Sequence, residues 1–104
     1  MRLVRVISKQ SLASFWRKHP ACREALQAWY AEVCHAEWAS PQDIKQRYVS
    51  ASFVAKNRVV FNIKGNEYRL VVAVAYRLQA VYIKFVGTHA QYDAIDVVTV
   101  ELDP

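Results

Sequence analysis

The sequence predicts an α+β fold, in which an N-terminal strand and two helices pack on an antiparallel sheet and a short helix lies near the C-terminus. Apolar residues recur at helical spacing in the first third of the chain, whereas residues 57–87 follow strand patterns broken by short turns. The composition, with 54% hydrophobic residues, 2 Gly and 3 Pro, favours a compact core over disorder. We therefore expect one domain that spans residues 1–104.

The first half of the chain predicts one strand and two helices. "LVRVI" at 3–7 is typical of a short strand, and residues 9–18 predict a helix that ends before Pro20. Residues 21–38 predict a second helix, because apolar residues repeat there at helical spacing. This stripe contains Ala25, Leu26, Trp29, Val33 and Ala36. Residues 39–48 predict a polar connection that can hold one helical turn.

The second half predicts the sheet. Three strands are expected at about 57–64, 67–76 and 80–87, followed by a short helix in "THAQYDAID". "VVTVEL", at the end of the chain, is typical of a last strand or an edge segment. These elements complete the α+β arrangement.

The first hairpin fixes which side chains share a face. Gly65-Asn66 predicts a two-residue turn with Gly first, as in a type II′ turn, which pairs Asn62 with Arg69. One face is then apolar and forms the core: Val59, Phe61, Ile63, Tyr68, Leu70, Val72 and Val74. The other face carries Arg58, Val60, Asn62, Lys64, Glu67, Arg69, Val71 and Ala73. Arg69 is therefore expected to stand beside Asn62 on an accessible surface.

The second hairpin extends this pattern. A turn at Leu78-Gln79 pairs Ala73 with Lys84 and Arg69 with Thr88. Val81, Ile83 and Phe85 then join the core face. Lys84 and His89 join Asn62 and Arg69 on the polar face, so separate segments bring cations and a histidine to one surface.

Charge is concentrated in the middle of the chain. Residues 44–89 hold eight Lys and Arg and one Glu, whereas residues 90–104 hold four Asp and Glu and no cation. A basic segment of this kind favours a polyanionic partner, with nucleic acid first. The alternative is a solvated sheet face balanced by the acidic tail. DNA binding is disfavoured, because no predicted helix carries a basic recognition face.

Candidate residues on this surface suit RNA cleavage, which needs no metal or cofactor because the neighbouring 2′-hydroxyl is the nucleophile. The candidates for catalysis are Arg69, His89 and Tyr92, and those for RNA binding are Lys56, Arg58, Asn62, Lys64 and Lys84. Arg69 can stabilise the charged phosphoryl oxygens, and His89 can act as acid or base. Tyr92 can face the same site or pack the terminal helix.

The strings "RVVFNIKGNEYRLVVAVAY" and "VYIKFVGTHAQYD" resemble the HigB toxins of the RelE-like superfamily, over about residues 48–96. The resemblance implies a RelE-like fold and a metal-independent mRNA interferase that acts on the translating ribosome. It also implies a HigA-type helix-turn-helix antitoxin that neutralises the toxin and represses the operon. The phosphate-binding arginine of the family matches Arg69, a RelE lysine falls on Asn62, and an arginine falls on His89. The C-terminal tyrosine matches Tyr92 only with a shorter spacing.

Two further expectations concern the setting. Cys22 and Cys34 are too far apart on one predicted helix for a disulfide, which fits a reducing cytoplasm. No apolar run approaches the roughly 20 residues of a membrane helix, and no secretory signal is recognisable, so no membrane partner is expected. A non-catalytic module that binds RNA or the ribosome remains the alternative function.

Overall fold

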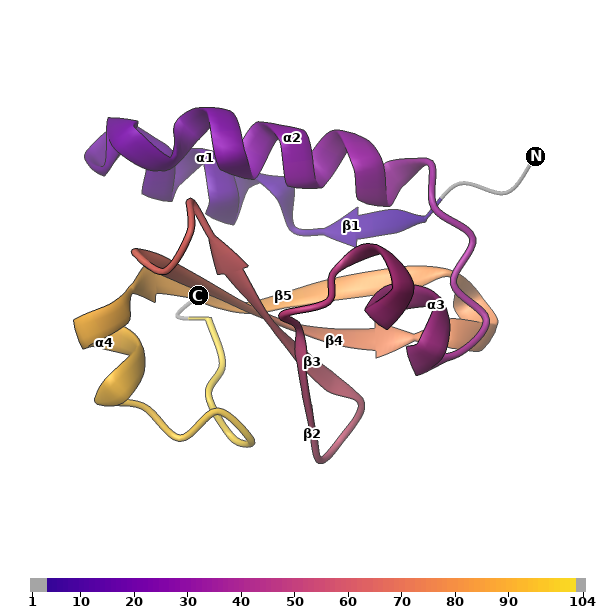
Figure 1. Ribbon diagram of the computed structural model, residues 1–104. Coiled ribbons are helices and arrows are strands. Elements are labelled where there is room, and N and C mark those ends of the chain that lie inside the picture. Colours follow the sequence, from indigo (N-terminus) through magenta and orange to yellow (C-terminus); the bar gives the residue numbers. More distant parts are fainter. Residues whose placement is uncertain (1–3, 103–104) are drawn as a thin grey trace.

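The structure, a computed structural model, describes residues 4–102, and Leu3 of the expected first strand lies outside them. Five strands form one sheet in the order β1-β5-β4-β3-β2 (Figure 1). Strand β1 runs parallel to β5, and the other neighbours are antiparallel. The elements are β1 (Arg5–Ile7), α1 (Lys9–Lys18), η1 (Pro20–Cys22), α2 (Arg23–Cys34), α3 (Pro41–Arg47), β2 (Ser52–Val54), β3 (Arg58–Ile63), β4 (Tyr68–Ala75), η2 (Tyr76–Leu78), β5 (Ala80–Thr88) and α4 (His89–Asp93). The predicted α+β class is confirmed.

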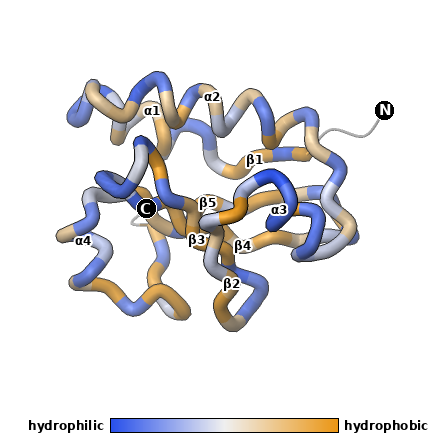
Figure 2. The backbone as a smooth tube through the Cα atoms, in the orientation of Figure 1, coloured by the Kyte–Doolittle hydropathy of each residue, from blue (hydrophilic) through white to orange (hydrophobic). Residues whose placement is uncertain are grey.

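Helices α1, α2 and α3 cover one face of the sheet, whereas α4 and the chain after it lie toward the other (Figure 1). Leu12, Leu26 and Ile44, one from each covering helix, are fully buried in the main core. In Figure 2 the strands at the centre of the molecule are the most apolar part of the tube. Every side chain that was expected on the core face of β3 and β4 belongs to this core. The two-layer arrangement leaves the second face of the sheet for other contacts.

Helix α2 is shorter than the expected 21–38. It begins at Arg23, after the 3₁₀ turn η1, and ends at Cys34. The reason lies in Trp38, which is only 4% exposed and whose ring stacks on Phe61 with centroids 6.3 Å apart. The chain must leave the helix to bring Trp38 onto the sheet, so tertiary packing overrides the helical pattern.

Two strand expectations were wrong. Residues 97–102, expected as a strand or edge segment, form turns and irregular chain. A short strand at Ser52–Val54 was missed, and it pairs with β3 through a tight turn in which Lys56 and Asn57 have positive φ. Gly is the usual residue in such a turn, and lysine is uncommon there, so the turn was not recognisable from its residues.

The hairpin between β3 and β4 has the predicted register. Asn62 pairs with Arg69, and Phe61 pairs with Leu70. The turn closes through a hydrogen bond of 3.3 Å from the Glu67 amide to the Lys64 carbonyl, with φ of 65° at Gly65. A glycine tolerates this φ without the steric cost that a Cβ atom brings, which is why the turn was predictable.

The hairpin between β4 and β5 does not have the predicted register. The connection is longer than the expected Leu78-Gln79 turn, because residues 76–78 form the 3₁₀ turn η2 and Gln79 adopts a left-handed conformation. Ala75 therefore pairs with Ala80, where Arg77 was expected to do so. This places the two strands two residues out of the predicted register at the turn.

A β-bulge then changes the register again. Val72 pairs with Ile83 but Val71 pairs with Phe85, so Lys84 is the additional residue. An inserted residue reverses the alternation of side chains beyond it. Val81 and Ile83 lie in the core as predicted, whereas Phe85 lies on the second face with Val71. The bulge also places Gly87, and not Thr88, opposite Arg69.

Among residues 4–102, no helix is both long enough and apolar enough to cross a membrane.

Candidate active site

Arg69 stands on the second face of the sheet, between Asn62 of β3 and Gly87 of β5. Its guanidinium is held by the β3–β4 turn. One terminal nitrogen donates to the Asn66 side-chain oxygen at 2.7 Å, and the other donates to the Asn66 carbonyl at 3.1 Å and the Tyr68 carbonyl at 3.3 Å. These bonds restrict a long side chain that remains partly exposed. Arg69 is therefore a preorganised cation that can bind an anion.

Helix α4 is anchored beside Arg69. Thr88 and Gln91 form a capping box, in which the Gln91 amide donates to the Thr88 hydroxyl at 3.1 Å and the Thr88 amide donates to the Gln91 side chain at 2.9 Å. The His89 amide also donates to the Glu67 carbonyl at 3.0 Å. Strand β5 thus passes directly into a short helix whose first residue is tied to the turn that precedes Arg69.

His89 projects from this helix with an acidic partner. Its Nδ1 atom lies 3.0 Å from Oδ2 of Asp93, and the imidazole is 46% exposed. When Nδ1 carries the proton that Asp93 accepts, a neutral imidazole presents an unprotonated Nε2 atom to solvent. The pair can therefore accept a proton at Nε2, and a protonated imidazole can return it.

Tyr92 lies at the same site as Arg69. The Cζ atom of Arg69 is 5.8 Å from the centroid of the Tyr92 ring, which is within the range of a cation–π contact. The Tyr92 ring also lies 6.5 Å from the Phe85 ring. The sequence left open whether Tyr92 faces the site or packs the terminal helix. The structure shows both contacts, because the same ring packs on Phe85 and faces the guanidinium.

Gly87 gives Phe85 the space for this contact. A Cβ atom at Gly87 would lie 2.5 Å from Cζ of Phe85 and 2.8 Å from the side-chain oxygen of Gln91. Neither approach is possible without movement, so a larger residue would displace the Phe85 ring and the side chain that caps α4. Gly87 is therefore part of what positions Tyr92 and His89.

Gly87→Ala is expected to destabilise the fold by about 1–3 kcal/mol, as overpacking does, and to loosen α4. Denaturant unfolding measures the first effect, and hydrogen exchange of the α4 amides measures the second. Gly65→Ala is the control, because a Cβ atom there meets nothing within 4 Å and the change brings only the strain of a positive φ. If Gly87→Ala and Gly65→Ala left α4 equally protected, Gly87 would have no special role.

The predicted RNA-binding residues do not all gather at this site. Asn62 is exposed opposite Arg69, and Lys64 lies in the adjacent turn with its Nζ atom 3.6 Å from Glu67. Lys56 lies in the β2–β3 turn, beyond the other end of β3. At about 3.3 Å per residue, it is roughly 20 Å along the chain from Asn62. The expectation that Lys56 lies close to the catalytic residues is therefore wrong.

Arg58 and Lys84 differ most from expectation. Arg58 was expected on an accessible surface but is 5% exposed, and its guanidinium binds the C-terminal segment at Val97, Val100 and Glu101. The Lys84 ammonium donates to Glu101 at 2.7 Å. The alternation of side chains along the strands assigned these residues to the second face of the sheet. It could not show that the end of the chain covers that face.

Asn66 and Gln91 are the site residues that the sequence did not single out. Asn66 was assigned only to a turn, although its side chain holds Arg69. Gln91 could have been found, because T-x-x-Q is the sequence signature of a capping box.

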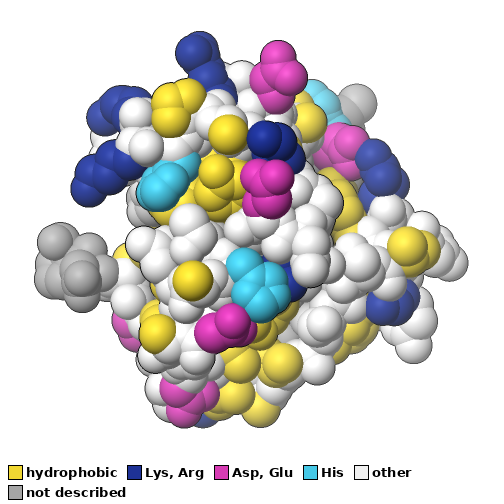
Figure 3. All heavy atoms as spheres, turned by 60° about the vertical axis from the view of Figure 1, so that its left-hand side comes forward, with side chains coloured by type: hydrophobic (Ala, Val, Ile, Leu, Met, Phe, Trp, Pro, Cys, Tyr) yellow, Lys and Arg dark blue, Asp and Glu magenta, His cyan; other side chains and the backbone are white. Residues whose placement is uncertain are grey.

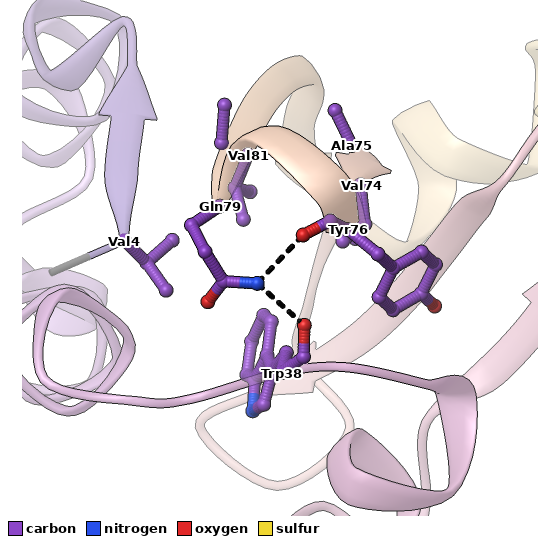
Figure 4. Close-up of a pocket in the computed structure, with 8 residues that line it drawn as sticks. Val4, Trp38, Val74, Ala75, Tyr76, Gln79 and Val81 are labelled. Atoms are coloured by element: carbon purple, nitrogen blue, oxygen red, sulfur yellow. Dashed lines mark hydrogen bonds between the residues drawn. The ribbon is translucent and has the colours of Figure 1, made fainter. Parts of the chain in front are cut away.

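The site is open surface and not an enclosed pocket. Figure 3 looks onto the end of the molecule that carries α4, where Lys and Arg side chains gather at the upper left and acidic side chains are scattered from the top to the lower left. The cavity in Figure 4 lies elsewhere, between Val4, Trp38 and the β4–β5 connection. There the Gln79 amide donates to the Trp38 and Tyr76 carbonyls, and no space for a water molecule is left. An open site suits a polymer better than a small molecule.

Within residues 4–102, no three His, Cys, Asp or Glu side chains come together as a metal site would require. The described residues of the site instead offer a fixed cation, an imidazole paired with a carboxylate and a tyrosine hydroxyl. This set can bind a phosphate and transfer protons beside it.

Comparisons with known proteins agree with this arrangement. Residues 22–95 match the family described as HigB_toxin, RelE-like toxic component of a toxin–antitoxin system. The mRNA interferase toxin HigB of Escherichia coli (strain K12) is 30% identical over 91 residues, which cover 85% of this chain and 86% of that protein. The mRNA interferase HigB of Escherichia coli O6:H1 is 23% identical over 92 residues, covering 86% of this chain and 89% of that protein. The matched region runs from α2 to the end of α4, and the chain belongs to the HigB family of RelE-like toxins.

Proposed function

We propose that this protein is an endoribonuclease that cleaves mRNA without a metal ion, as the toxin of a toxin–antitoxin system. The observation that carries the proposal is the placement of Arg69, anchored by Asn66, beside the helix that bears His89 and Tyr92. The printed names of the relatives, mRNA interferase, support the choice of substrate. The substrate and the activity are inferred from these two lines together.

In the proposed reaction, the 2′-hydroxyl of one nucleotide attacks the adjacent phosphorus and the 5′-oxygen of the next nucleotide leaves. Nε2 of His89 removes the hydroxyl proton while Asp93 stabilises the imidazolium that forms. The Arg69 guanidinium binds the non-bridging oxygens, on which negative charge increases in the transition state. The hydroxyl of Tyr92, whose ring faces Arg69, is the candidate donor to the leaving oxygen.

Asn62 and Lys64 border Arg69 and are proposed to contact the neighbouring nucleotides. We propose that the mRNA is cut on the translating ribosome in the cytoplasm and that a HigA-type antitoxin neutralises the protein. These assignments rest on family membership. The open site is compatible with them, because it leaves room for a large substrate.

Lys64→Gln is expected to weaken RNA binding and to reduce the slope of log K against log salt by roughly 0.7–0.9, the value for one lost phosphate contact. Binding of a single-stranded RNA, measured from low to moderate salt, gives this slope. Arg77→Gln is the matched control, because Arg77 is exposed in η2 at the other end of β4. Equal slopes for both variants would show that Lys64 is only a solvated charge.

The function is tested by inducing the protein in cells and mapping new RNA 5′ ends against reading frames. Cleavage of translated mRNA gives new ends within coding sequences, and co-expression of the antitoxin abolishes them. A module that only binds RNA or the ribosome would slow translation without creating new ends, and that result would replace the proposed function with the alternative.

A further inference from the structure

The chain after α4 returns across the second face of the sheet and is fastened there by buried Arg58. The Arg58 guanidinium donates to the Val97 carbonyl at 3.0 Å, the Val100 carbonyl at 2.6 Å and a Glu101 carboxylate oxygen at 2.7 Å. The second Glu101 oxygen accepts from Lys84 at 2.7 Å. One carboxylate thus joins β3, β5 and the C-terminal segment, residues 94–102.

The contacts of buried Arg58 restrict the path of the C-terminal segment more than an exposed ion pair would. Arg58 is 5% exposed, and a buried cation is stable only when its donors are satisfied. Two of its acceptors are backbone carbonyls of the segment, so the segment has to follow one path to supply them. The hydrogen bond from Lys84, together with that from Arg58, lowers the pKa of Glu101.

The segment is continuous with the helix that bears the proposed catalytic residues. The Ile95 amide donates to the Tyr92 carbonyl at 3.2 Å, which prolongs α4 by a turn. Asp96 then organises the next turn, because its carbonyl accepts from the Val100 amide at 2.9 Å and its side chain accepts from the Val98 amide at 3.0 Å. Local hydrogen bonds therefore order the chain between Tyr92 and the carbonyls that Arg58 holds.

Helix α4 needs this support because it has only five residues, His89–Asp93. A helix of this length is not stable by itself, since nucleation costs more than so few hydrogen bonds return. Its first turn is held by the Thr88 cap and by the Glu67 carbonyl. Its C-terminal end continues directly into the C-terminal segment, so the path of that segment fixes where this end of the helix lies.

We propose that Arg58 and Glu101 are positioning residues that fasten the C-terminal segment and so hold α4, which bears His89 and Tyr92, beside Arg69. The inference deepens the proposed function and rests on it. It assigns Arg58, which patterning placed among the RNA-binding residues, to the geometry of the site. Neither Arg58 nor Glu101 touches the RNA in this account.

The test compares Arg58→Met and Glu101→Gln with Arg77→Met, which removes an equal charge from exposed η2. Hydrogen exchange is expected to become at least tenfold faster across residues 89–102 in Arg58→Met, with β3 and β4 unchanged. Glu101→Gln, at an exposed position, is expected to fold normally and to show a smaller effect in the same residues. Arg77→Met is expected to match the wild type.

Single-turnover cleavage separates positioning from RNA binding. Arg58→Met is expected to lower the maximal single-turnover rate at least tenfold, with the half-saturating protein concentration changed less than threefold, and Arg58→Lys to restore part of the rate. A folded Arg58→Met with wild-type exchange in α4, an effect on the half-saturating concentration alone, or faster cleavage would each overturn the inference. The last result would mean that the segment shields the site. If the wild type cleaved no RNA, the proposed function would fail, but the exchange measurement would still decide whether Arg58 holds α4.

Discussion

Arg69→Ala is expected to lower the cleavage rate by roughly 10²–10³, the cost of losing one preorganised donor to a transition-state anion. The structure gives the physical reason. Asn66 and the Tyr68 carbonyl hold the guanidinium before substrate arrives, so little reorganisation is needed when charge develops on the phosphate. Single-turnover cleavage of a translated message measures the effect. The fold is expected to survive, because the side chain lies outside the main core.

Two variants sharpen this prediction. Arg69→Lys keeps the charge but loses the fork, and it is expected to restore only part of the rate because an ammonium cannot bind two oxygens in one plane. Arg77→Ala removes an exposed arginine at the other end of β4 and is expected to cleave like the wild type. A folded Arg69→Ala protein that kept the wild-type rate would remove Arg69 from the mechanism.

His89→Ala is expected to lower the single-turnover rate by roughly 10²–10⁴, the usual contribution of a positioned acid or base. The limb of the pH–rate profile that reports the imidazole is expected to disappear with it. Asp93→Asn tests the orientation of the ring separately, because the amide can present either a donor or an acceptor to Nδ1. We expect a smaller loss of rate in Asp93→Asn, with the limb of the profile retained.

The contrary outcome for His89 is specific. If His89→Ala cleaves at the wild-type rate with the same pH profile, the histidine serves only to begin α4, and Tyr92 becomes the better candidate for proton transfer. His89→Gln controls for packing, since a glutamine fills similar space but does not titrate. His35, exposed at the end of α2, supplies a matched control in His35→Ala, which is expected to have no effect.

The fold was predictable where local chemistry and alternation agree. The β3–β4 hairpin has a glycine at one of its two positions of positive φ, Lys64 being the other, and a regular apolar face, so its register followed from the sequence. The β4–β5 hairpin has neither signal. Its connection turns through Gln79 in a left-handed conformation, and a bulge at Lys84 reverses the faces beyond it. Register of this kind depends on contacts between strands, which a single sequence does not display.

The placement of α4 beside Arg69 could be predicted even though the β4–β5 register was wrong. Arg69 lies at the end of β4 that adjoins α4, the helix that bears His89 and Tyr92. Even a register that was wrong by one residue therefore placed this helix beside Arg69. The role of Arg58 was not predictable, because its partners lie 39 to 43 residues further along the chain. Alternation assigns a side chain to a face, but only the complete fold shows whether another segment covers that face.

The central claim, that the RNA's own 2′-hydroxyl is the nucleophile, is tested most directly by the chemistry of the cut ends. The account predicts a 2′,3′-cyclic phosphate or its 3′-phosphate product on one fragment and a 5′-hydroxyl on the other. A message with one 2′-deoxynucleotide at the mapped cleavage site is predicted to remain intact there while neighbouring sites are still cut. Fragments with 5′-phosphate ends, or cleavage at the deoxy position, would contradict the proposed mechanism.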